Sequence, residues 1–351
     1  VLIVPFVMPG FILAKKIYQM TTGIDWSQYD SMVLLHHGVF TFDDDARRCY
    51  EKMIDTVTRA EHYIESHVGP QKVVSRPDTD NDAEADLLML ANTRKQVSAA
   101  RGTAVYALLD DSAESCSFAG MNDVDTIATR GPLTPDHIIR TRQSPLIIEQ
   151  EIDDDVTAVE DYAAAYRAYF DRNAVEQQVC LDPAPRWAVW KQHGLVSFGS
   201  TLKETGIISD ISRHTIKAIQ LEEKLAGCRV LPEKELFEME YCELEQAKIN
   251  KMKACPQFQG KIALLTGAAS GIGKACVEAL FEKGAAVAAL DVDPSINGMF
   301  GRDQVLELGC DVTSDAELNL SVLATVRRFG GLDIAVSNAG IFTANETIEQ
   351  M

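Results

Sequence analysis

The sequence predicts an α/β protein in which strands and helices alternate and the last part forms half of a doubly wound parallel sheet. Two stretches carry this prediction. Residues 261–291 read as a strand, a glycine-rich turn, a helix and a second strand, and residues 32–65 read as two short strands followed by an amphipathic helix. The chain has 351 residues, 46% of them apolar, which is enough for two or three domains with buried cores.

The opening stretch, VLIVPFVMPGFILAKK, is mostly apolar but is interrupted by Pro5, Pro9 and Gly10. It is too short to span a bilayer, and no basic stretch precedes it as in a signal peptide. Because the sequence begins without methionine and stops abruptly at Met351, we expect both ends to fall inside domains of a longer protein.

Residues 32–65 come next in the chain. We expect a buried strand at residues 32–35, the sequence His-His-Gly, a second strand at residues 39–42 and a helix that begins near Asp44. Asp43, Asp44 and Asp45 crowd the start of this helix, where the helix dipole favours negative charge. The spacing of the apolar residues predicts that one helix face points inward, namely Ala46, Met53, Ile54, Val57 and Ala60.

This pattern resembles the class II aldolase/adducin family, in which the histidine just before such a glycine is a zinc ligand; here that residue is His37. The resemblance implies a Zn²⁺ ion that polarises a ketose carbonyl and stabilises the ene-diolate formed on carbon–carbon cleavage. Zinc needs three protein ligands, yet no two histidines here have the family's His-x-His spacing, and Asp43 stands where the family usually has glycine. Two interpretations stay open: a ligand completed by residues outside this sequence, or a strand-end histidine that binds no metal.

A polar segment rich in Pro and Asp, residues 69–84, predicts an exposed linker. Beyond it we expect a helix at residues 87–101, a strand at residues 103–109 and a helix that starts at Thr134-Pro135, with proline at the first helical position. His137, Arg140 and Arg142 are candidates for contact with an anion, although a solvated turn with ordinary charges is the simpler explanation.

A further helix is expected at residues 153–172, with its aromatic residues in the core: Tyr162, Tyr166, Tyr169 and Phe170. After it, the stretch from His193 to Phe198 repeats the pattern from His37 to Phe42 at a constant offset along the chain, and each copy is followed by a long helix. We interpret this as a diverged internal duplication. Since the second copy also lacks His-x-His, we expect its role to be structural rather than metal binding.

The glycine-rich turn of residues 261–291 has a physical reason for each glycine. Gly267 permits the tight turn, Gly271 lets the backbone approach a pyrophosphate, and Gly273 lets helix and strand pack closely. The helix N-terminus offers N–H groups and a favourable dipole to the anion. Asp291 stands at the end of the next strand, where it can accept hydrogen bonds from the ribose hydroxyls of NAD and repel the 2′-phosphate of NADP.

These residues resemble the short-chain dehydrogenase/reductase family and its motif TGxxxGxG. Two further marks follow at the expected distances: Asp311-Val312, which resembles the pair that touches adenine, and the stretch from Ser337 to Gly340, which resembles NNAG. The alternative is a glycine turn in some other strand–helix–strand unit. The resemblance implies an NAD site made of Thr266, Gly267, Ser270, Gly271, Ile272, Gly273, Asp291, Asp311, Val312, Asn338, Ala339 and Gly340.

The catalytic group of that family is a tyrosine with a lysine four residues later, together with a serine, all beyond the NNAG mark. None of the nine tyrosines of this sequence has a lysine at that spacing. We therefore expect this chain by itself to be inactive as a dehydrogenase, although it keeps the nucleotide-binding pattern.

The order of the patterns predicts three regions. Residues 1–70 are expected to be the C-terminal half of a class II aldolase-like domain, residues 71–255 a second aldolase-like region with a helical connector at residues 233–253, and residues 256–351 the N-terminal half of a Rossmann domain. Together they resemble fusions of a rhamnulose-phosphate aldolase with a short-chain dehydrogenase. The resemblance implies cleavage of a deoxyketose 1-phosphate to dihydroxyacetone phosphate and lactaldehyde, with NAD-linked oxidation or reduction of the aldehyde. The alternative is a non-catalytic nucleotide-binding and structural protein derived from such a fusion.

The net charge of −19 argues against binding to nucleic acid or anionic membranes, which requires clustered Lys and Arg. The eight cysteines are scattered without CxxC or zinc-finger spacing, as expected for reduced thiols in the cytoplasm, and we expect Cys276 and Cys310 in the core. The expected partners are small-molecule substrates. Because a sheet that ends with a strand at residues 332–337 has an apolar edge, we also expect a homo-oligomer.

Overall fold

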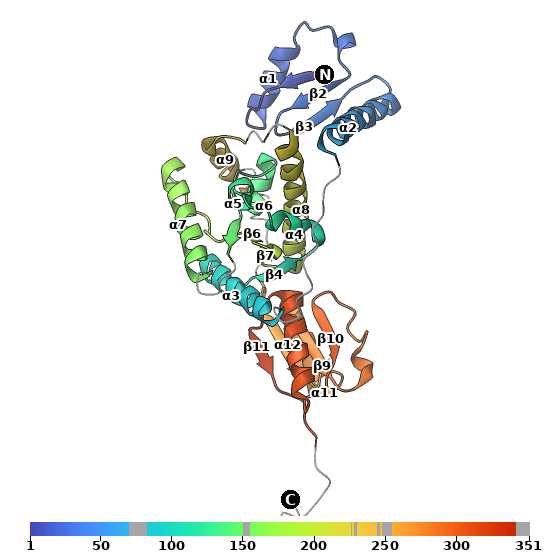
Figure 1. Ribbon diagram of the computed structural model, residues 1–351, viewed down its shortest axis with the longest axis vertical. Coiled ribbons are helices and arrows are strands. Elements are labelled where there is room, and N and C mark those ends of the chain that lie inside the picture. The colour runs from blue at the N-terminus through green and yellow to red at the C-terminus, as the bar shows by residue number, and fades with distance from the viewer. Residues whose placement is uncertain are drawn as a thin grey trace, which may run out of the picture.

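The computed structural model describes residues 1–69, 83–149, 155–225, 227, 230–243, 246–247 and 255–341. Its strands form three sheets that follow one another along the long axis of the molecule (Figure 1). The linker expected at residues 69–84 lies almost wholly outside the described residues, and so does much of the connector expected at residues 233–253. None of the described helices is long and apolar enough to cross a bilayer.

The N-terminal unit contains β1 (Leu2–Val4), α1 (Phe11–Thr21), a short 3-10 turn (Trp26–Gln28), β2 (Ser31–Leu34), β3 (Gly38–Thr41) and α2 (Ala46–Val68). Its sheet has the order β1-β2-β3, with β1 parallel and β3 antiparallel to β2. Side chains of α1 cover Val4, Met32 and Leu34. Asp45 caps α2 by accepting a hydrogen bond from the Arg48 N–H at 2.9 Å, so the expected helix start is correct to within two residues.

The prediction that one face of α2 points inward is wrong. No residue of α2 is buried, Ile54 and Val57 are 49% and 44% exposed, and Ala46 and Ala60 are exposed as well, which leaves Met53 half-buried. The main neighbours of α2 in the described part of the chain are β2, β3 and α8 (Leu202–Leu225), and they leave most of the expected face open to solvent.

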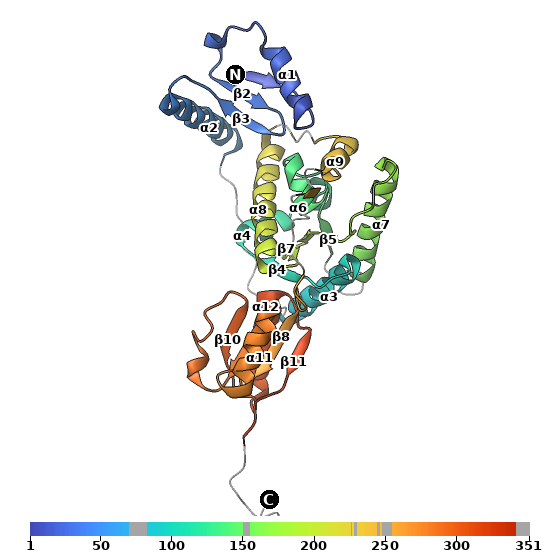
Figure 2. The same ribbon diagram turned by 180° about the vertical axis from the view of Figure 1, so that it is seen from behind.

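The middle part is built around a sheet of order β4-β7-β6-β5, formed by β4 (Tyr106–Asp110), β5 (Leu146–Ile148), β6 (Trp187–Trp190) and β7 (Gly194–Gly199). Only the pair β5–β6 is parallel. The helices around it are α3 (Ala83–Arg101), α4 (Ala113–Ala119), α5 (Val124–Ala128), α6 (Ile138–Thr141), α7 (Asp155–Asn173), α8 and α9 (Glu233–Glu240), and Figure 2 shows them from behind. The helix expected at Thr134-Pro135 is a 3-10 turn (Pro135–His137) followed by the single turn α6.

Aromatic residues of α7 lie in the core, as the helical spacing predicts. Tyr166 and Tyr169 are buried against Phe237 of α9, and Phe170 packs on the same cluster. The two cysteines expected in the C-terminal core also lie there. Cys310 is buried, and Cys276 is partly buried against the C-terminal sheet.

The repeat expected from the sequence has a structural counterpart. Both copies form an antiparallel hairpin, β2–β3 and β6–β7, with a non-glycine residue in the left-handed region just before the histidine: His36 at φ 63° and Gln192 at φ 66°. The N–H of His37 donates to Leu34, and that of His193 donates to Trp190, both at 3.0 Å. The helices α2 and α8 then begin at the same distance along the chain after the two histidines, and they pack against each other.

The C-terminal part is a parallel sheet of order β10-β9-β8-β11. Its elements are β8 (Ile262–Thr266), α11 (Gly271–Glu282), β9 (Ala286–Asp291), a 3-10 turn (Pro294–Ile296), β10 (Val305–Gly309), α12 (Asp315–Phe329) and β11 (Ile334–Val336). The strand order, with the chain crossing back over β8 to reach β11, is that of half a doubly wound sheet. The predicted fold class is therefore confirmed.

The amino ends of these parallel strands pack on the middle part. Tyr106 of β4 is buried with Ile262 and Ala286, and its hydroxyl donates to the Gly284 carbonyl at 3.1 Å. Arg94 of α3 donates to the carbonyl oxygens of Val105 and Gly260 at 2.5 and 3.0 Å, and pairs with Asp333 at 2.6 Å just before β11. The carboxyl ends of the strands consequently point away from the middle part.

Candidate functional site: a cleft at the carboxyl ends of the parallel strands

A cleft of about 510 Å³ opens at the carboxyl ends of β8, β9 and β10, beside the loop after β11. It lies where the chain order reverses between β8 and β11, which is where doubly wound sheets bind ligands. All residues of the predicted nucleotide site except Thr266 line this cleft.

The turn between β8 and α11 shows what each glycine does. A Cβ on Gly273 would overlap the carbonyl oxygen of Gly267, so this glycine lets the first turn of α11 sit against the loop. Gly267 has φ 70°, and a Cβ there would lie 2.9 Å from the Cα of Ala339. Gly271 has φ 51°, and a Cβ there would meet no atom within 4 Å, so the space at the helix N-terminus is open. That space is the cradle in which backbone N–H groups can meet a phosphate.

Thr266 does not line the cleft, but its hydrogen bonds hold the loop that does. Its hydroxyl oxygen accepts hydrogen bonds from the N–H groups of Asn338 and Ala339, each at 3.1 Å. The Asn338 amide in turn donates to the carbonyl oxygens of Thr266 and Gly267 at 3.0 and 3.2 Å. These bonds tie the loop after β11 to the glycine turn, so Thr266 positions the cleft wall.

Asp291 ends β9 with a carboxylate that is already fixed in place. One oxygen accepts from the Ala269 N–H at 2.8 Å, and the other accepts from the Asp293 N–H at 2.9 Å. A carboxylate offers about four lone-pair sites, so Asp291 keeps acceptor capacity for hydroxyl groups in the cleft.

The loop after β10 forms another wall of the cleft. Asp311 accepts from the N–H and the hydroxyl of Thr313 at 2.9 and 2.8 Å, and these bonds hold the pKa of the Asp311 carboxyl below its ordinary value. Four lining residues are absent from the predicted site: Val292, Cys310, Thr313 and Ile341. Each directly adjoins a predicted residue, so the rule that ligands lie beyond strand ends could have found them.

Comparison with known proteins agrees with this geometry. Residues 84–249 match the family described as aldolase class II, second domain, and residues 261–351 match the short chain dehydrogenase family. The chain joins a class II aldolase region to a short-chain dehydrogenase region. It is 26% identical over 366 aligned positions to the uncharacterized oxidoreductase YuxG of Bacillus subtilis, covering 97% of this chain and 52% of that protein.

The dehydrogenase region has further relatives. It is 41% identical over 90 residues to human 15-hydroxyprostaglandin dehydrogenase [NAD(+)], covering 23% of this chain and 34% of that protein. A solved structure, 3-ketoacyl-(acyl-carrier-protein) reductase from Brucella melitensis complexed with NADH, shares 34% identity with a TM-score of 0.25, covering 26% of this chain and 39% of that one. The chain thus spans about half or less of the length of these curated relatives.

The N-terminal unit, which precedes the aldolase region, does not gather a metal site around His37. The Nε2 atom of His37 lies 2.9 Å from the Val7 carbonyl oxygen, and its ring stacks on Phe6. Among the described residues, no three His, Cys, Asp or Glu side chains gather closely enough to hold a metal ion. The zinc ligand set implied by the family resemblance therefore does not fit the described part of the chain.

His193 in the aldolase region, the counterpart of His37, also contacts protein oxygens and an aromatic ring. Its Nδ1 lies 2.8 Å from the Lys191 carbonyl oxygen, its Nε2 lies 3.0 Å from Asp86, and its ring stacks on Trp190. Both ring nitrogens thus contact protein oxygens, and the contact with Asp86 connects the β6–β7 hairpin to α3.

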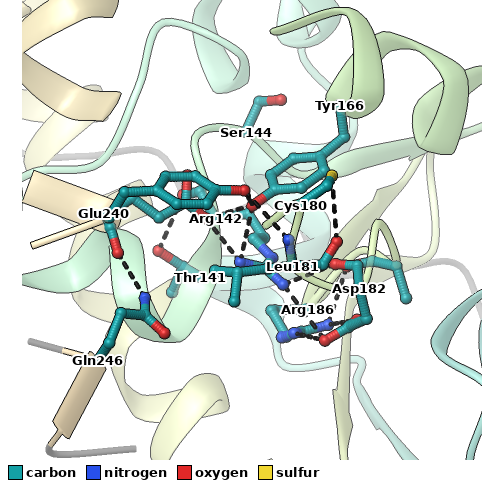
Figure 3. Close-up of polar contacts among 12 residues, drawn as sticks. Thr141, Arg142, Ser144, Tyr166, Cys180, Leu181, Asp182, Arg186, Glu240 and Gln246 are labelled. Carbon is teal, nitrogen blue, oxygen red and sulfur yellow. Dashed lines mark hydrogen bonds and ion pairs between the residues drawn. The ribbon is translucent and has the colours of Figure 1, made fainter. Parts of the chain in front are cut away.

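Arg142 of the aldolase region is neither an anion ligand nor a solvated charge. It is 3% exposed, pairs with the fully buried Glu240 of α9 at 2.6 Å, and donates to the Tyr166 hydroxyl at 3.1 Å and the Asp182 carbonyl at 2.7 Å (Figure 3). Burial lowers the pKa of this guanidinium, but the Glu240 carboxylate outweighs burial and the net pKa is raised. Arg142 therefore fastens α9 to the rest of the region. Nearby His137 has a pKa lowered by burial.

Proposed function

We propose that the dehydrogenase region binds NAD in the cleft between the glycine turn and the loop after β11, as part of an NAD-dependent oxidoreductase joined to an aldolase. The observation that carries the proposal is the pairing of an open, glycine-lined helix N-terminus with a fixed carboxylate at the end of the neighbouring strand. The dinucleotide, when bound, would supply the hydride-accepting nicotinamide.

Different residues of the cleft would bind different parts of the dinucleotide. The N–H groups at the start of α11, opened by Gly271, would hold the pyrophosphate, and Asp291 would accept hydrogen bonds from the ribose hydroxyls. Asp311 and Val312 would meet the adenine, and the stretch from Asn338 to Gly340 would border the path toward the nicotinamide. A 2′-phosphate would stand against the Asp291 carboxylate, so we expect NAD in preference to NADP.

For the aldolase region we propose a sugar-phosphate lyase of the rhamnulose-1-phosphate type, whose aldehyde product the dehydrogenase region would oxidise or reduce. The match of residues 84–249 to the second domain of class II aldolases supports this proposal.

A second candidate is a protein that binds the nucleotide without catalysis. It is favoured by the contrast between the cleft, which gathers the predicted nucleotide-binding residues, and the absence of any tyrosine followed by lysine four residues later in this sequence. A positioned acid–base group contributes about 10²- to 10⁴-fold to a rate. We therefore expect this chain by itself to show no detectable NADH formation with lactaldehyde or simple alcohols.

Calorimetric titration of the 351-residue chain with NAD⁺ and NADP⁺ tests the binding proposal. We expect tighter binding of NAD⁺, and we expect Asp291→Ala to narrow the difference by roughly tenfold, because a charge-assisted hydrogen bond to ribose and the repulsion of the 2′-phosphate are both lost. Asp303→Ala, on an exposed loop away from the cleft, is the control and should leave both affinities unchanged.

Equal affinities for the two nucleotides in the unchanged chain would contradict the role of Asp291, and absence of binding would contradict the site itself. Steady NADH production by the same sample would instead show that a catalytic group lies within the chain and would rule out the non-catalytic candidate.

A further inference from the structure

The helix α2 carries an apolar stripe that the described part of the chain leaves exposed. Tyr50, Ile54 and Val57 follow one another at spacings of four and three residues, which places them on one side of the helix, and they are 67%, 49% and 44% exposed. At the corresponding positions the helix of the second copy, α8, carries Gly206, Asp210 and Arg213. The exposed stripe is thus peculiar to α2, although both helices follow the same hairpin.

The stripe has a basic residue at its N-terminal end and an acidic residue at its C-terminal end. Arg47 and Glu61 each lie about two helical turns from Ile54, one before it and one after it, so both side chains leave α2 on the side of the stripe. Arg47 pairs with Glu51 of the next turn at 2.8 Å, and both of these side chains are largely exposed. Such a pair is weak and can exchange partners at little cost.

We propose that α2 docks antiparallel against α2 of a second copy of this chain through the stripe Tyr50, Ile54 and Val57. An antiparallel pair related by a two-fold axis near Ile54 sets Arg47 of each copy opposite Glu61 of the other, at both ends of the contact. A parallel pair in register would instead set like charges side by side. The stripe and its flanking charges are therefore complementary to themselves in one orientation.

The composition of α2 favours this occupant over a membrane surface. The helix carries four basic residues, Arg47, Arg48, Lys52 and Arg59, and four acidic ones, Glu51, Asp55, Glu61 and Glu65. It has no excess of positive charge to attract anionic lipids. Because a single helix pair buries less than a standard interface of about 1,600 Å², we expect a dimer with a dissociation constant on the order of micromolar.

Sedimentation velocity of the 351-residue chain over a range of concentrations tests the contact. We expect a monomer–dimer equilibrium that the double variant Ile54→Lys, Val57→Lys shifts fully to monomer, with an unchanged circular dichroism spectrum because both positions are exposed. The matched control is Val175→Lys, Val179→Lys, which changes two other valines that are 68% and 80% exposed, and it should leave the equilibrium as it is.

Charge exchange tests the orientation. Arg47→Glu should raise the dissociation constant by roughly tenfold, because it creates a like-charge pair at each end of the contact, and Arg47→Glu combined with Glu61→Arg should restore it. A chain that remains monomeric throughout, or a dimer that persists in Ile54→Lys, Val57→Lys, would overturn the proposal. Failure of the combined exchange to restore the dimer would overturn the antiparallel arrangement.

Discussion

The N-terminal unit and the aldolase region contain the same arrangement of strand, hairpin and helix, yet they differ in burial. In the aldolase region, every residue of β6 and β7 is buried. In the N-terminal unit, β3 alternates between exposed and half-buried residues, and α2 has no buried residue. The backbone geometry around His36 and Gln192 is nevertheless almost the same. Local sequence thus determines the hairpin, whereas burial depends on what surrounds it.

The surroundings differ in the number of covered faces. In β6, Trp187 and Val189 pack with α4, α5 and α8 on one face, while Ala188 and Trp190 pack with α3 and α7 on the other. The N-terminal sheet has one principal apolar cluster, shared with α1. The hairpin between two helical layers therefore contributes to a core, while its copy in the smaller N-terminal sheet remains partly open to solvent.

Substitutions in the two copies should differ most in their effect on the free energy of unfolding at the glycines that follow the two histidines, Gly38 and Gly194. Gly38 and Gly194 have φ of 147° and 129°, so alanine is strained at both positions. A Cβ on Gly194 would also overlap the Asp110 carbonyl oxygen of the neighbouring strand, whereas a Cβ on Gly38 would meet no atom within 4 Å. We expect Gly194→Ala to lower the free energy of unfolding by roughly 4 kcal/mol and Gly38→Ala by about 1 kcal/mol.

Urea unfolding followed by tryptophan fluorescence measures both variants, since Trp187 and Trp190 report on the sheet that contains Gly194 and Trp26 packs on Phe42 beside the sheet that contains Gly38. Equal losses in the two variants would mean that strain alone, rather than the neighbouring strand, sets the cost.

The second difference concerns corresponding helix positions. Ile219 of α8 and Tyr63 of α2 occupy the same position in the two copies, but Ile219 is 5% exposed and Tyr63 is 59% exposed. Truncation to alanine leaves a cavity only at the first position. We expect Ile219→Ala to cost about 3 kcal/mol and Tyr63→Ala less than about 0.5 kcal/mol, measured by the same unfolding experiment. A large cost for Tyr63→Ala would show that α2 is covered in solution at that position.

The smallest effect concerns acid stability of the aldolase region. Burial raises the pKa of Asp182, but hydrogen bonds from Arg186 at 2.7 and 2.8 Å outweigh it and bring the pKa to about 2. Because the folded pKa lies below the unfolded value of about 3.9, the stabilisation is present above about pH 4 and is lost as the pH falls toward 2.

Asp182→Asn should therefore lower stability at neutral pH by about 1 to 2 kcal/mol and flatten its decline between about pH 4 and pH 2. Thermal unfolding at a series of pH values measures this. An unchanged acid profile in the variant would mean that other carboxylates account for the decline.

The parts that the sequence predicts well are those governed by short-range rules. The glycine turn, Asp291 and Asp311 each lie at or just beyond the carboxyl end of a strand in a parallel sheet, so their meeting in one cleft follows from strand order and motif spacing. The pairing of Arg142 with Glu240, which lies 98 residues further along, has no such signature because it depends on where α9 packs. Packing between distant segments also decides the burial of α2. Its amphipathic spacing predicts an apolar face but does not predict whether another element covers that face.

The attachment of the dehydrogenase sheet by the amino ends of its strands has a kinetic consequence. Tyr106 and Arg94 hold that end against the aldolase region, and the nucleotide cleft opens at the opposite end of the sheet. A nucleotide can therefore enter and leave the cleft without opening the contacts between the two regions, so its exchange rate is set at the cleft itself.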